Sequence, residues 1–404
     1  RILRENAFEV GIDPKFEVID EAEASYLRAE ATEQVLAHLE TGADPLLRAV
    51  IDEFGLRGQG PFDKRLLEYS QEVVARVRAM PEGFEGLRLS EPTATPSPTA
   101  TPVPEPQEIT ITFGGDCTLA GDVNKNNTRF QSFVEEYGYD YFLANLKPIF
   151  EADDLTIVNL EGPLTTSDDK RGGRQFNFRG DPGNAQILSA ASVEAVHMAN
   201  NHARDFQEEG YEDTLAAVEA VGIVPYGYAQ TQVMEVKGVK IGLIGLTEWD
   251  YEPSEVREMV AQLREECDIL VATFHWGEEL RYTSTSTQRK FAEAAIEAGA
   301  DVVVGHHPHV VSGVAEYEGV PVVFSVGNLC FGGNIRPTDM DAMLFQVHFT
   351  VDHTGAILEY DFTVIPIRVS GNAKENDYQP YVAEGDEAER ILEKIEGYSL
   401  VDIR

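Results

Sequence analysis

The sequence contains few cysteines, no long apolar run and no nucleotide-binding loop. Its three cysteines, Cys117, Cys267 and Cys330, are far apart, so they form neither a disulfide framework nor a CxxC zinc motif. No apolar run reaches the roughly 18 residues of a membrane-spanning helix, and no secretion signal is visible. The GxxxxGK[ST] motif is absent as well, which argues against a nucleotide-driven motor.

Basic side chains are scarce relative to acidic ones. The 404 residues include 32 Lys and Arg against 70 Asp and Glu, which gives a formal net charge of −38. Because nucleic acids and anionic membranes are also negative, neither is expected as a general partner. The chain is nevertheless 43% hydrophobic, enough for a sizeable core, and its length allows two or more domains.

The first 107 residues differ in composition from the remainder. Residues 1–91 are charged and helix-forming, and the runs 1–7 and 13–23 loosely resemble an internal helical segment of UvrD-type and AddA-like helicases. Without a phosphate-binding motif, a charged helical module with no catalysis is the better interpretation. Residues 92–107 are rich in Pro and Thr and predict an extended spacer, of the kind that holds a domain away from a cell surface.

From residue 108 onward, strand patterns alternate with helical patterns. This order predicts βαβ units and a largely parallel sheet, whose ligands bind at the carboxyl ends of the strands. Residues 371–404 are expected to be an acidic C-terminal tail with one short helix. The predicted strands are 109–113, 155–158, 193–199, 240–246, 268–274, 301–304, 320–326, 343–351 and 356–367, and the main predicted helices are 207–221, 286–298 and 386–396.

Metal-binding side chains gather where these predicted strands end. Gly305-His306-His307-Pro308-His309 places three imidazoles in four residues directly after a buried strand, and histidine is the commonest metal ligand. Carboxylate, amide and imidazole together suit Mn, Fe, Zn or Mg, and two such ions would clamp a phosphoryl group. A remaining histidine would then act as general acid. The other candidates at strand ends are Asp116, Glu161, Asn201, His202 and His275.

These motifs resemble those of the CapA family, the bacterial capsule or poly-γ-glutamate synthesis proteins within the calcineurin-like metallophosphoesterases. The resemblance covers about 108–370 and keeps the family's order and spacing. It implies a four-layer α/β/β/α metallophosphatase-like sandwich with a dinuclear site. The segments that carry it are FGGD (113–116), NLEGPL (159–164), ANNHARD (199–205), HWGEE (275–279), GHHPHV (305–310) and FSVGN (324–328).

The resemblance also implies roles for single residues. His202 takes the place of the leaving-group histidine, and Asp205 either orients His202 or is a charge at a helix N-terminus. One departure concerns the D-x-H motif of ordinary phosphoesterases, because Asp116 is followed here by Cys117 and Thr118. The implied metal ligands are Asp116, Glu161, Asn201, His275, His307 and His309.

Three further residues are candidates for substrate binding. Arg179 lies with Arg174 in a loop that either meets an anionic substrate or is simply solvated. His306 is additional to the closing H-x-H motif, and Asn328 either contacts substrate or caps its loop.

Two functions are consistent with these patterns. The first is a hydrolase of phosphoesterase type that holds two divalent metal ions and acts in capsule or poly-γ-glutamate biosynthesis. The alternative is a non-catalytic cell-surface protein that binds polymer or acts as a scaffold through the same cleft. The expected partners are an anionic polymer or phosphoester substrate and the membrane proteins of a capsule synthase, with no nucleic acid and no transmembrane segment in this chain. The expected location is the cell surface or the extracellular space, either free or in association with the membrane.

Overall fold

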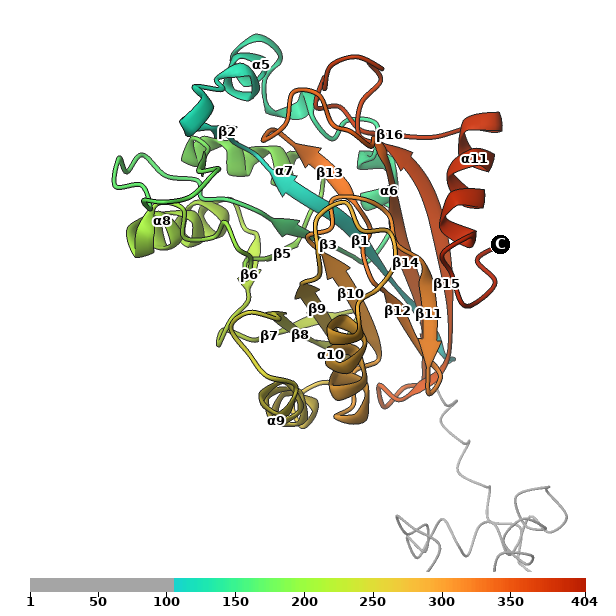
Figure 1. Cartoon of the computed structure of the whole chain (residues 1–404). Helices are drawn as coiled ribbons and strands as arrows, with labels where there is room; N and C mark the ends of the chain where they lie inside the picture. Colours follow the sequence, from blue (N-terminus) through green and yellow to red (C-terminus); the bar gives the residue numbers. More distant parts are fainter. Residues whose placement is uncertain (1–104) are drawn as a thin grey trace, which may run out of the picture. The chain divides into compact units, whose positions relative to one another are not determined.

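Two β-sheets lie face to face, and helices cover their outer surfaces (Figure 1). The computed structural model describes residues 105–404. The helical segment predicted over 1–91 and nearly all of the spacer predicted over 92–107 lie outside the described residues. Those two predictions and the domain boundaries stay predictions.

The larger sheet has eight strands. Its parallel part is β1 (Gln107–Thr118), β3 (Leu155–Leu160), β5 (Ala195–His197) and β6 (Val224–Tyr226), and β13 (Asn328–Phe331) also runs parallel to β1. Its antiparallel part is β14 (Asp341–Val351), β15 (Ile357–Arg368) and β16 (Tyr381–Val382). The late strands run antiparallel because a short turn, closed by Gly355 at φ +87°, joins β14 directly to β15.

The smaller sheet has six strands in the order β11, β12, β10, β9, β8 and β7. The four central strands are parallel, and the two at the edges are antiparallel to their neighbours. The bounds are β7 (Gln232–Val236), β8 (Val239–Thr247), β9 (Ile269–His275), β10 (Val302–His306), β11 (Val314–Tyr317) and β12 (Val320–Val323). A separate pair, β2 (Gly121–Asp122) and β4 (Phe178–Arg179), is antiparallel.

Helices lie on both outer faces. On the larger sheet are α5 (Arg129–Tyr137), α6 (Lys147–Phe150), α7 (Gln186–Ala190) and α8 (Gln207–Ala220), and on the smaller sheet are α9 (Pro253–Arg264) and α10 (Ser286–Glu297). Helix α10 begins at a capping box, in which the Thr285 side chain accepts from the Gln288 backbone N–H and the Gln288 side chain accepts from that of Thr285. The short 3₁₀ helices are η2 (Val123–Lys125), η3 (Tyr139–Tyr141) and η4 (Pro182–Ala185).

The alternation of side chains along the strands builds three cores. In β10, Val302 and Val304 face the other sheet, whereas Val303 faces outward and packs with α9 and α10. In β3, Ile157 lies between the sheets and Val158 packs under the helices of the larger sheet. The expected four-layer α/β/β/α sandwich is therefore confirmed.

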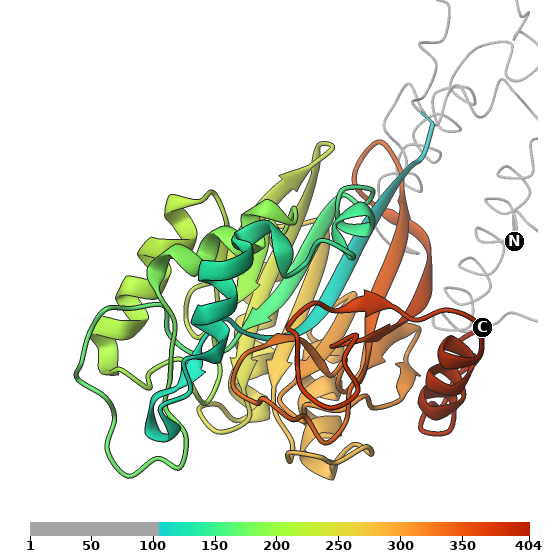
Figure 2. The same ribbon diagram turned by 90° about the horizontal axis from the view of Figure 1, so that it is seen from above.

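The C-terminal segment joins this core. Helix α11 (Gly385–Glu396) lies beside β15, and its Ile391 and Ile395 are buried in the cluster that also fills the space between the sheets. In Figure 2 this helix, coloured red, stands next to the late strands. The helix predicted for 386–396 is thus present, and its apolar stripe anchors the acidic segment to the sandwich.

Candidate metal centre

Two rows of side chains, one from each sheet, meet at the carboxyl ends of the central strands. In the larger sheet, Asp116 of β1 is in register with Asn328 of β13 and Asn159 of β3. In the smaller sheet, His275 of β9 is in register with His306 of β10. Asp116, Asn159, His275 and His306 lie near the carboxyl ends of parallel strands, and Asn328 begins β13, so the fold itself brings segments far apart in the sequence to one site.

Asp116 reaches the site because β1 is irregular there. The register with β3 shifts between Phe113 and Asp116, so the strand changes which side chains it turns to each face. The residue before Asp116 is Gly115, where a Cβ would lie 2.1 Å from the carbonyl oxygen of Gly327. The backbone N–H of Asp116 donates to that oxygen at 3.0 Å. Only glycine permits this close approach.

The most compact group of ligand atoms comes from Asp116, Glu161 and His275. One atom of each lies within 4.8 Å of the others, and all three side chains are fully buried. Asn201 adjoins this group, with its Oδ1 2.9 Å from Nε2 of His275. Four of the predicted ligands therefore lie together.

The loop after β10 supplies the remaining histidines. His307 and His309 have φ of 95° and 57°, a region that side chains other than glycine rarely adopt and that often marks a functional site. The His307 backbone N–H donates to Asp116 Oδ2 at 3.3 Å. The ring of His309 lies between the two acids, with Nδ1 3.1 Å from Asp116 Oδ2 and Nε2 3.8 Å from Glu161 Oε1.

Burial controls the charge of these imidazoles. It lowers the pKa of His306 to about 4 and, together with His309, that of His307 to about 3. It also lowers the pKa of His275 well below the usual 6.5. These three rings are neutral at neutral pH, so each keeps a nitrogen lone pair for a metal.

His309 and the two carboxylates behave differently from the other histidines. Burial alone would lower the pKa of His309, but Glu161 and Asp116 outweigh burial and raise it. Burial raises the pKa of Glu161, whereas in Asp116 the contacts with His309 outweigh burial and lower the pKa. A protonated His309 thus holds a positive charge between two carboxylates.

Glu161 tests whether a cation fits here. Both of its carboxylate oxygens are buried and accept no hydrogen bond from any described residue. A buried carboxylate without donors is costly, and a divalent cation removes that cost. Both ring nitrogens of His306 and Nδ1 of His307 also have no hydrogen-bond partner within the described region. Carboxylate and imidazole donors together suit Zn, Mn or Fe, so the residues present fit a divalent metal.

His202 and Asp205 form a hydrogen-bonded pair beside the carboxylates. Nδ1 of His202 lies 2.7 Å from Asp205 Oδ2, which also accepts from the backbone N–H of Phe178. Nε2 of His202 lies 3.9 Å from Glu161 Oε1, so it points into the site. Asp205 is fully buried and fixes the orientation of the ring.

The three candidates for substrate binding are placed differently. Asn328 is close to the metal ligands, because its Oδ1 lies 2.9 Å from His309 Nδ1. His306 is only 1% exposed, so it lies behind the site rather than at its mouth. Arg179 donates to the backbone oxygen of Ser167 at 2.7 Å and to Asp168 Oδ1 at 2.6 Å, and it does not line the cavity described below. All three roles stay predictions.

Sequence reasoning overlooked two residues at the site. The side-chain amide of Asn159 donates to Asp116 Oδ1 at 2.7 Å and lies 3.3 Å from His275 Nδ1, so it bridges the two sheets. The sequence feature that could have identified Asn159 as a site residue is its position two residues before Glu161, in the same motif. Trp249, which is 49% exposed, places its ring 4.9 Å from that of His307. No pattern in the sequence marks Trp249.

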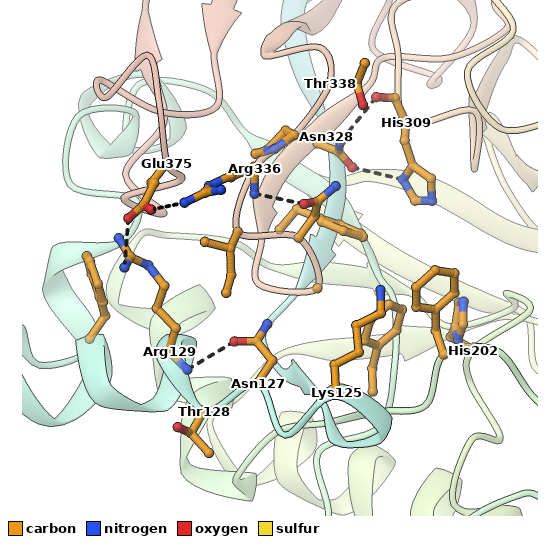
Figure 3. A pocket seen from close by; sticks show the side chains of 18 of the residues that line it. Lys125, Asn127, Thr128, Arg129, His202, His309, Asn328, Arg336, Thr338 and Glu375 are labelled. Atoms are coloured by element: carbon orange, nitrogen blue, oxygen red, sulfur yellow. Dashed lines mark hydrogen bonds and ion pairs between the residues drawn. The ribbon is translucent and has the colours of Figure 1, made fainter.

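A cavity of about 980 Å³ opens beside this group and is lined by His202, His309 and Asn328 (Figure 3). It extends away from the ligands toward α5 and the loop after β13. The site is therefore reached through an open cavity rather than sealed inside the core.

The fold and the site together define an α/β/β/α sandwich with a carboxylate and histidine metal centre at the strand ends. The family model of the bacterial capsule synthesis protein PGA_cap matches residues 110–333, more than half of the chain. The chain belongs to this family.

Curated relatives agree with this assignment. The chain is 28% identical over 285 residues to the PGA biosynthesis protein CapA of Bacillus subtilis, covering 65% of this chain and 72% of that protein. It is 24% identical over 294 residues to the capsule biosynthesis protein CapA of Bacillus anthracis, covering 66% and 68%. A probable polyglutamine synthesis accessory protein of Mycobacterium tuberculosis is 25% identical over 254 residues, covering 54% and 67%.

Solved structures show more distant similarity. The protein TT1561 of Thermus thermophilus has a TM-score of 0.32 and 13% identity, covering 64% of this chain and 99% of that one. Vps29 of Entamoeba histolytica, solved as a complex with zinc, has a TM-score of 0.26 and 12% identity, covering 63% and 99%.

Proposed function

We propose that this protein acts in the biosynthesis of a capsule polymer of the poly-γ-glutamate type, through a metal-dependent hydrolase site of phosphoesterase type. Family membership supports the process, because the matching family and its relatives carry capsule or PGA synthesis in their names. The observation that carries the site is Glu161, a fully buried carboxylate that accepts no hydrogen bond from any described residue and lies in the same compact group as Asp116 and His275.

The proposed cofactor is a pair of divalent ions, Mn, Fe, Zn or Mg. When bound, such ions would polarise a phosphoryl oxygen and lower the pKa of a coordinated water. The oxygen ligands would be Asp116, Glu161 and Asn201, and the nitrogen ligands would be His275, His307 and His309. Of these, His309 would have to release its proton to bind.

His202 is the proposed general acid. Its Nδ1 is held by Asp205 at 2.7 Å, which leaves Nε2 facing the site to deliver a proton to the leaving oxygen. Asp205 would stabilise the protonated ring and keep it in this orientation. Asn159 would hold the Asp116 carboxylate in place through its 2.7 Å hydrogen bond.

A second candidate function is a non-catalytic protein that binds polymer through the same cleft. One observation favours it: no imidazole stands two residues after Asp116. Cys117 packs in the hydrophobic core, and Thr118 is fully buried. Neither residue supplies the nitrogen that the D-x-H motif of ordinary phosphoesterases provides, so one ion would be held by fewer ligands.

The proposed partners are an anionic polymer or phosphoester substrate and the membrane proteins of a capsule synthase, and the proposed location is the cell surface. The names of the relatives support the polymer, and the Pro/Thr-rich tract 92–107 supports the location. Among the described residues, no helix has the length and apolar character needed to cross a membrane.

The test is the metal content of the purified full chain, compared with the double variant His307→Ala/His309→Ala. About two ions per chain, lost in the double variant, would support the centre, and turnover of a generic phosphodiester would support hydrolysis. The matched control His348→Ala/His353→Ala removes two histidines outside the site and should keep the metal. Failure to bind stoichiometric metal, even after reconstitution with Mn or Zn, would overturn the hydrolase and favour the binding protein.

A further inference from the structure

A basic loop lies beside the metal centre and takes no part in the proposed metal chemistry. Residues 170–179 contain four of the 32 basic residues of the chain and no acidic one, although the formal net charge is −38. Residues 170–176 are called the basic arm below. Its Lys170 and Arg171 are exposed, and its Arg174 is half-buried. Positive charge gathered in so acidic a chain attracts anions to this edge of the site.

The basic arm is built against the loop that carries Asn201 and His202. The backbone N–H of Arg171 donates to the Asp205 backbone oxygen at 2.7 Å. The side-chain amide of Asn177, which is buried, donates to the backbone oxygens of Arg171 at 3.1 Å and of Asp205 at 3.3 Å. The arm is therefore fixed to the segment that supplies a metal-ligand candidate and the proposed general acid.

Asn124 holds the basic arm from a second direction. Its side-chain amide donates to the Arg174 backbone oxygen at 3.2 Å and to Asn177 Oδ1 at 2.8 Å. Its Oδ1 accepts from Lys170 Nζ at 2.8 Å. Because hydrogen bonds fix the arm along its length, its basic side chains are positioned before any ligand binds, which lowers the entropy cost of binding.

Arg174 places its charge next to a metal-ligand candidate. Its Nη2 donates to the backbone oxygen of Asn201 at 3.4 Å, and Oδ1 of Asn201 lies 2.9 Å from Nε2 of His275. Arg174 forms no ion pair with any described carboxylate, whereas the charge of Arg179 is already neutralised by Asp168. Since a guanidinium carries several N–H donors, Arg174 keeps donors for an anionic ligand.

The position of Arg174 limits what it can bind. Its guanidinium contacts the same residue that offers Oδ1 to the metal centre, so a ligand must bring its second anionic group close to the reacting phosphoryl group. A guanidinium binds a phosphate through two parallel hydrogen bonds. A diphosphate meets this requirement, because one bridging oxygen joins its two phosphates, whereas a monophosphate leaves Arg174 without a partner.

We propose that Arg174 binds the second phosphate of a diphosphate ester whose first phosphate occupies the metal centre. The inference rests on the proposed function, because it takes the metal centre as the place of the reacting phosphoryl group. Lys170 and Arg171 attract the anion from solvent. The half-burial of Arg174 and its contact with Asn201 favour a small ligand at the site over a nucleic acid lying across the surface.

The test is calorimetric titration of the full, metal-loaded chain, after removal of unbound metal, with three non-hydrolysable probes. Methylenediphosphonate carries two phosphonates, phosphonoacetate a phosphonate and a carboxylate, and methylphosphonate one phosphonate. We expect methylenediphosphonate to bind about tenfold more tightly than methylphosphonate, and Arg174→Gln should remove most of that preference while leaving methylphosphonate binding unchanged. Tighter binding of phosphonoacetate than of methylenediphosphonate would make the second group a carboxylate and overturn the diphosphate.

Two variants control for charge and for structure. Arg289→Gln removes an arginine of α10 that, like Arg174, donates to a backbone oxygen, that of Ser284 at 3.0 Å, and it should bind every probe like the unmodified chain. Arg174→Lys keeps the charge without the paired hydrogen bonds and should keep part of the preference. Equal losses for methylenediphosphonate and methylphosphonate in Arg174→Gln would mean that Arg174 only supports Asn201, and would overturn the proposal.

Metal content is measured on the same preparations, so that the two proposals fail separately. A metal-loaded chain that binds methylenediphosphonate no more tightly than methylphosphonate would refute the Arg174 subsite alone. A chain that holds no metal but binds methylenediphosphonate in a way that depends on Arg174 would refute the hydrolase alone, and a chain that does neither would refute both. Tighter binding of a DNA oligonucleotide than of methylenediphosphonate, lost in Lys170→Gln/Arg171→Gln, would assign the basic arm to nucleic acid and overturn the proposal.

Discussion

The two sheets bring different chemistry to the same place. The larger sheet supplies the oxygen ligand candidates: Asp116, Glu161 and Asn201. The smaller sheet supplies the nitrogen ligand candidates: His275, His307 and His309. Neither sheet alone holds a mixed set, so the centre exists only where the two sheets pack against each other.

This division implies that metal binding and sheet packing stabilise each other. A ligand that binds only the folded state raises stability by about 2.7 kcal/mol at a hundred times its Kd. Because the ligands come from both sheets, that energy resists their separation. Substitutions in either sheet test how far metal binding depends on ligands from both.

The largest expected effect is loss of the metal from substitutions on either side. Asp116→Asn and His275→Ala should each abolish high-affinity binding, although the residues lie in different sheets. Both side chains are fully buried and belong to the compact ligand group. The measurement is metal content together with the rise of Tm on adding Mn or Zn, which should vanish in both variants.

The carboxylate substitution and the histidine substitution each have a matched control. Glu279→Gln removes a carboxylate that lines the cavity without belonging to the ligand group, and His348→Ala removes an imidazole of the larger sheet that lies elsewhere. Both should keep the metal. If Asp116→Asn bound metal as tightly as the unmodified chain, the Asp116 carboxylate would not be a ligand, and the dependence on both sheets would rest on Glu161 and Asn201.

The next largest effect concerns the packing between the sheets. Phe345 is fully buried there, with ring centres 6.5 Å from Phe113 and 5.4 Å from Phe362. Phe345→Ala should lower the free energy of unfolding by about 3–5 kcal/mol, because it leaves a cavity in the core. Urea unfolding measures this loss. Leu358→Ala, at a side chain 56% exposed, should change stability by less than about 0.5 kcal/mol.

The sequence predicted the chemical groups of the site better than their arrangement. Buried strands such as 301–304 are recognisable, and the carboxyl ends of parallel strands converge, so residues that follow them could be placed together without coordinates. Four layers followed from the family resemblance rather than from periodicity. Periodicity alone predicted one largely parallel sheet and could not divide the strands between two.

Side-chain partners were beyond sequence reasoning. Arg179 was a candidate for substrate, but the structure pairs it with Asp168. Asn159 has the same alternating pattern as any strand residue, and only the register between β1 and β3 reveals that it touches Asp116. Because the last 34 residues have an acidic composition, the sequence did not reveal that Ile391 and Ile395 pack α11 into the core.

A smaller loss of metal affinity is expected from substitution of Asn159, which contacts ligand candidates of both sheets. Asn159 donates to Asp116 and lies against His275, so Asn159→Ala should free both ligands and weaken metal affinity about tenfold. Metal titration measures the change. Asn184→Ala removes another buried carboxamide, one that donates to the Leu119 backbone oxygen, and should leave metal affinity unchanged. Equal losses in both variants would mean that Asn159 acts only through stability.

The smallest effect contrasts Glu161 with a buried carboxylate that the protein itself neutralises. Asp341 is 5% exposed and pairs with Arg390 at 2.7 Å, Lys394 at 2.9 Å and Arg368 at 3.0 Å. Burial alone would raise the pKa of Asp341, but Arg390 and Lys394 outweigh it and hold the pKa well below its usual range. Asp341 thus needs no metal. Glu161, by contrast, accepts no hydrogen bond from any described residue, and its nearest described basic groups are His309 and His202, at 3.8 and 3.9 Å.

The depressed pKa of the Asp341 carboxyl determines the direction in which the stability of the protein changes with pH. The folded state favours the charged form, so the contribution of Asp341 is fully present above the unfolded pKa of about 3.9 and is lost as pH falls below it. Asp341→Asn should therefore be about 1–2 kcal/mol less stable at pH 7, and the difference should shrink by pH 3. Urea unfolding at both pH values, with and without added metal, measures it. Asp341 pairs with Arg390 and Lys394 of α11 and not with the metal ligands, so the stability difference between Asp341→Asn and the unmodified chain should be the same with and without metal. A difference that changes with metal would mean that the Asp341 cluster and the metal site are coupled through the larger sheet.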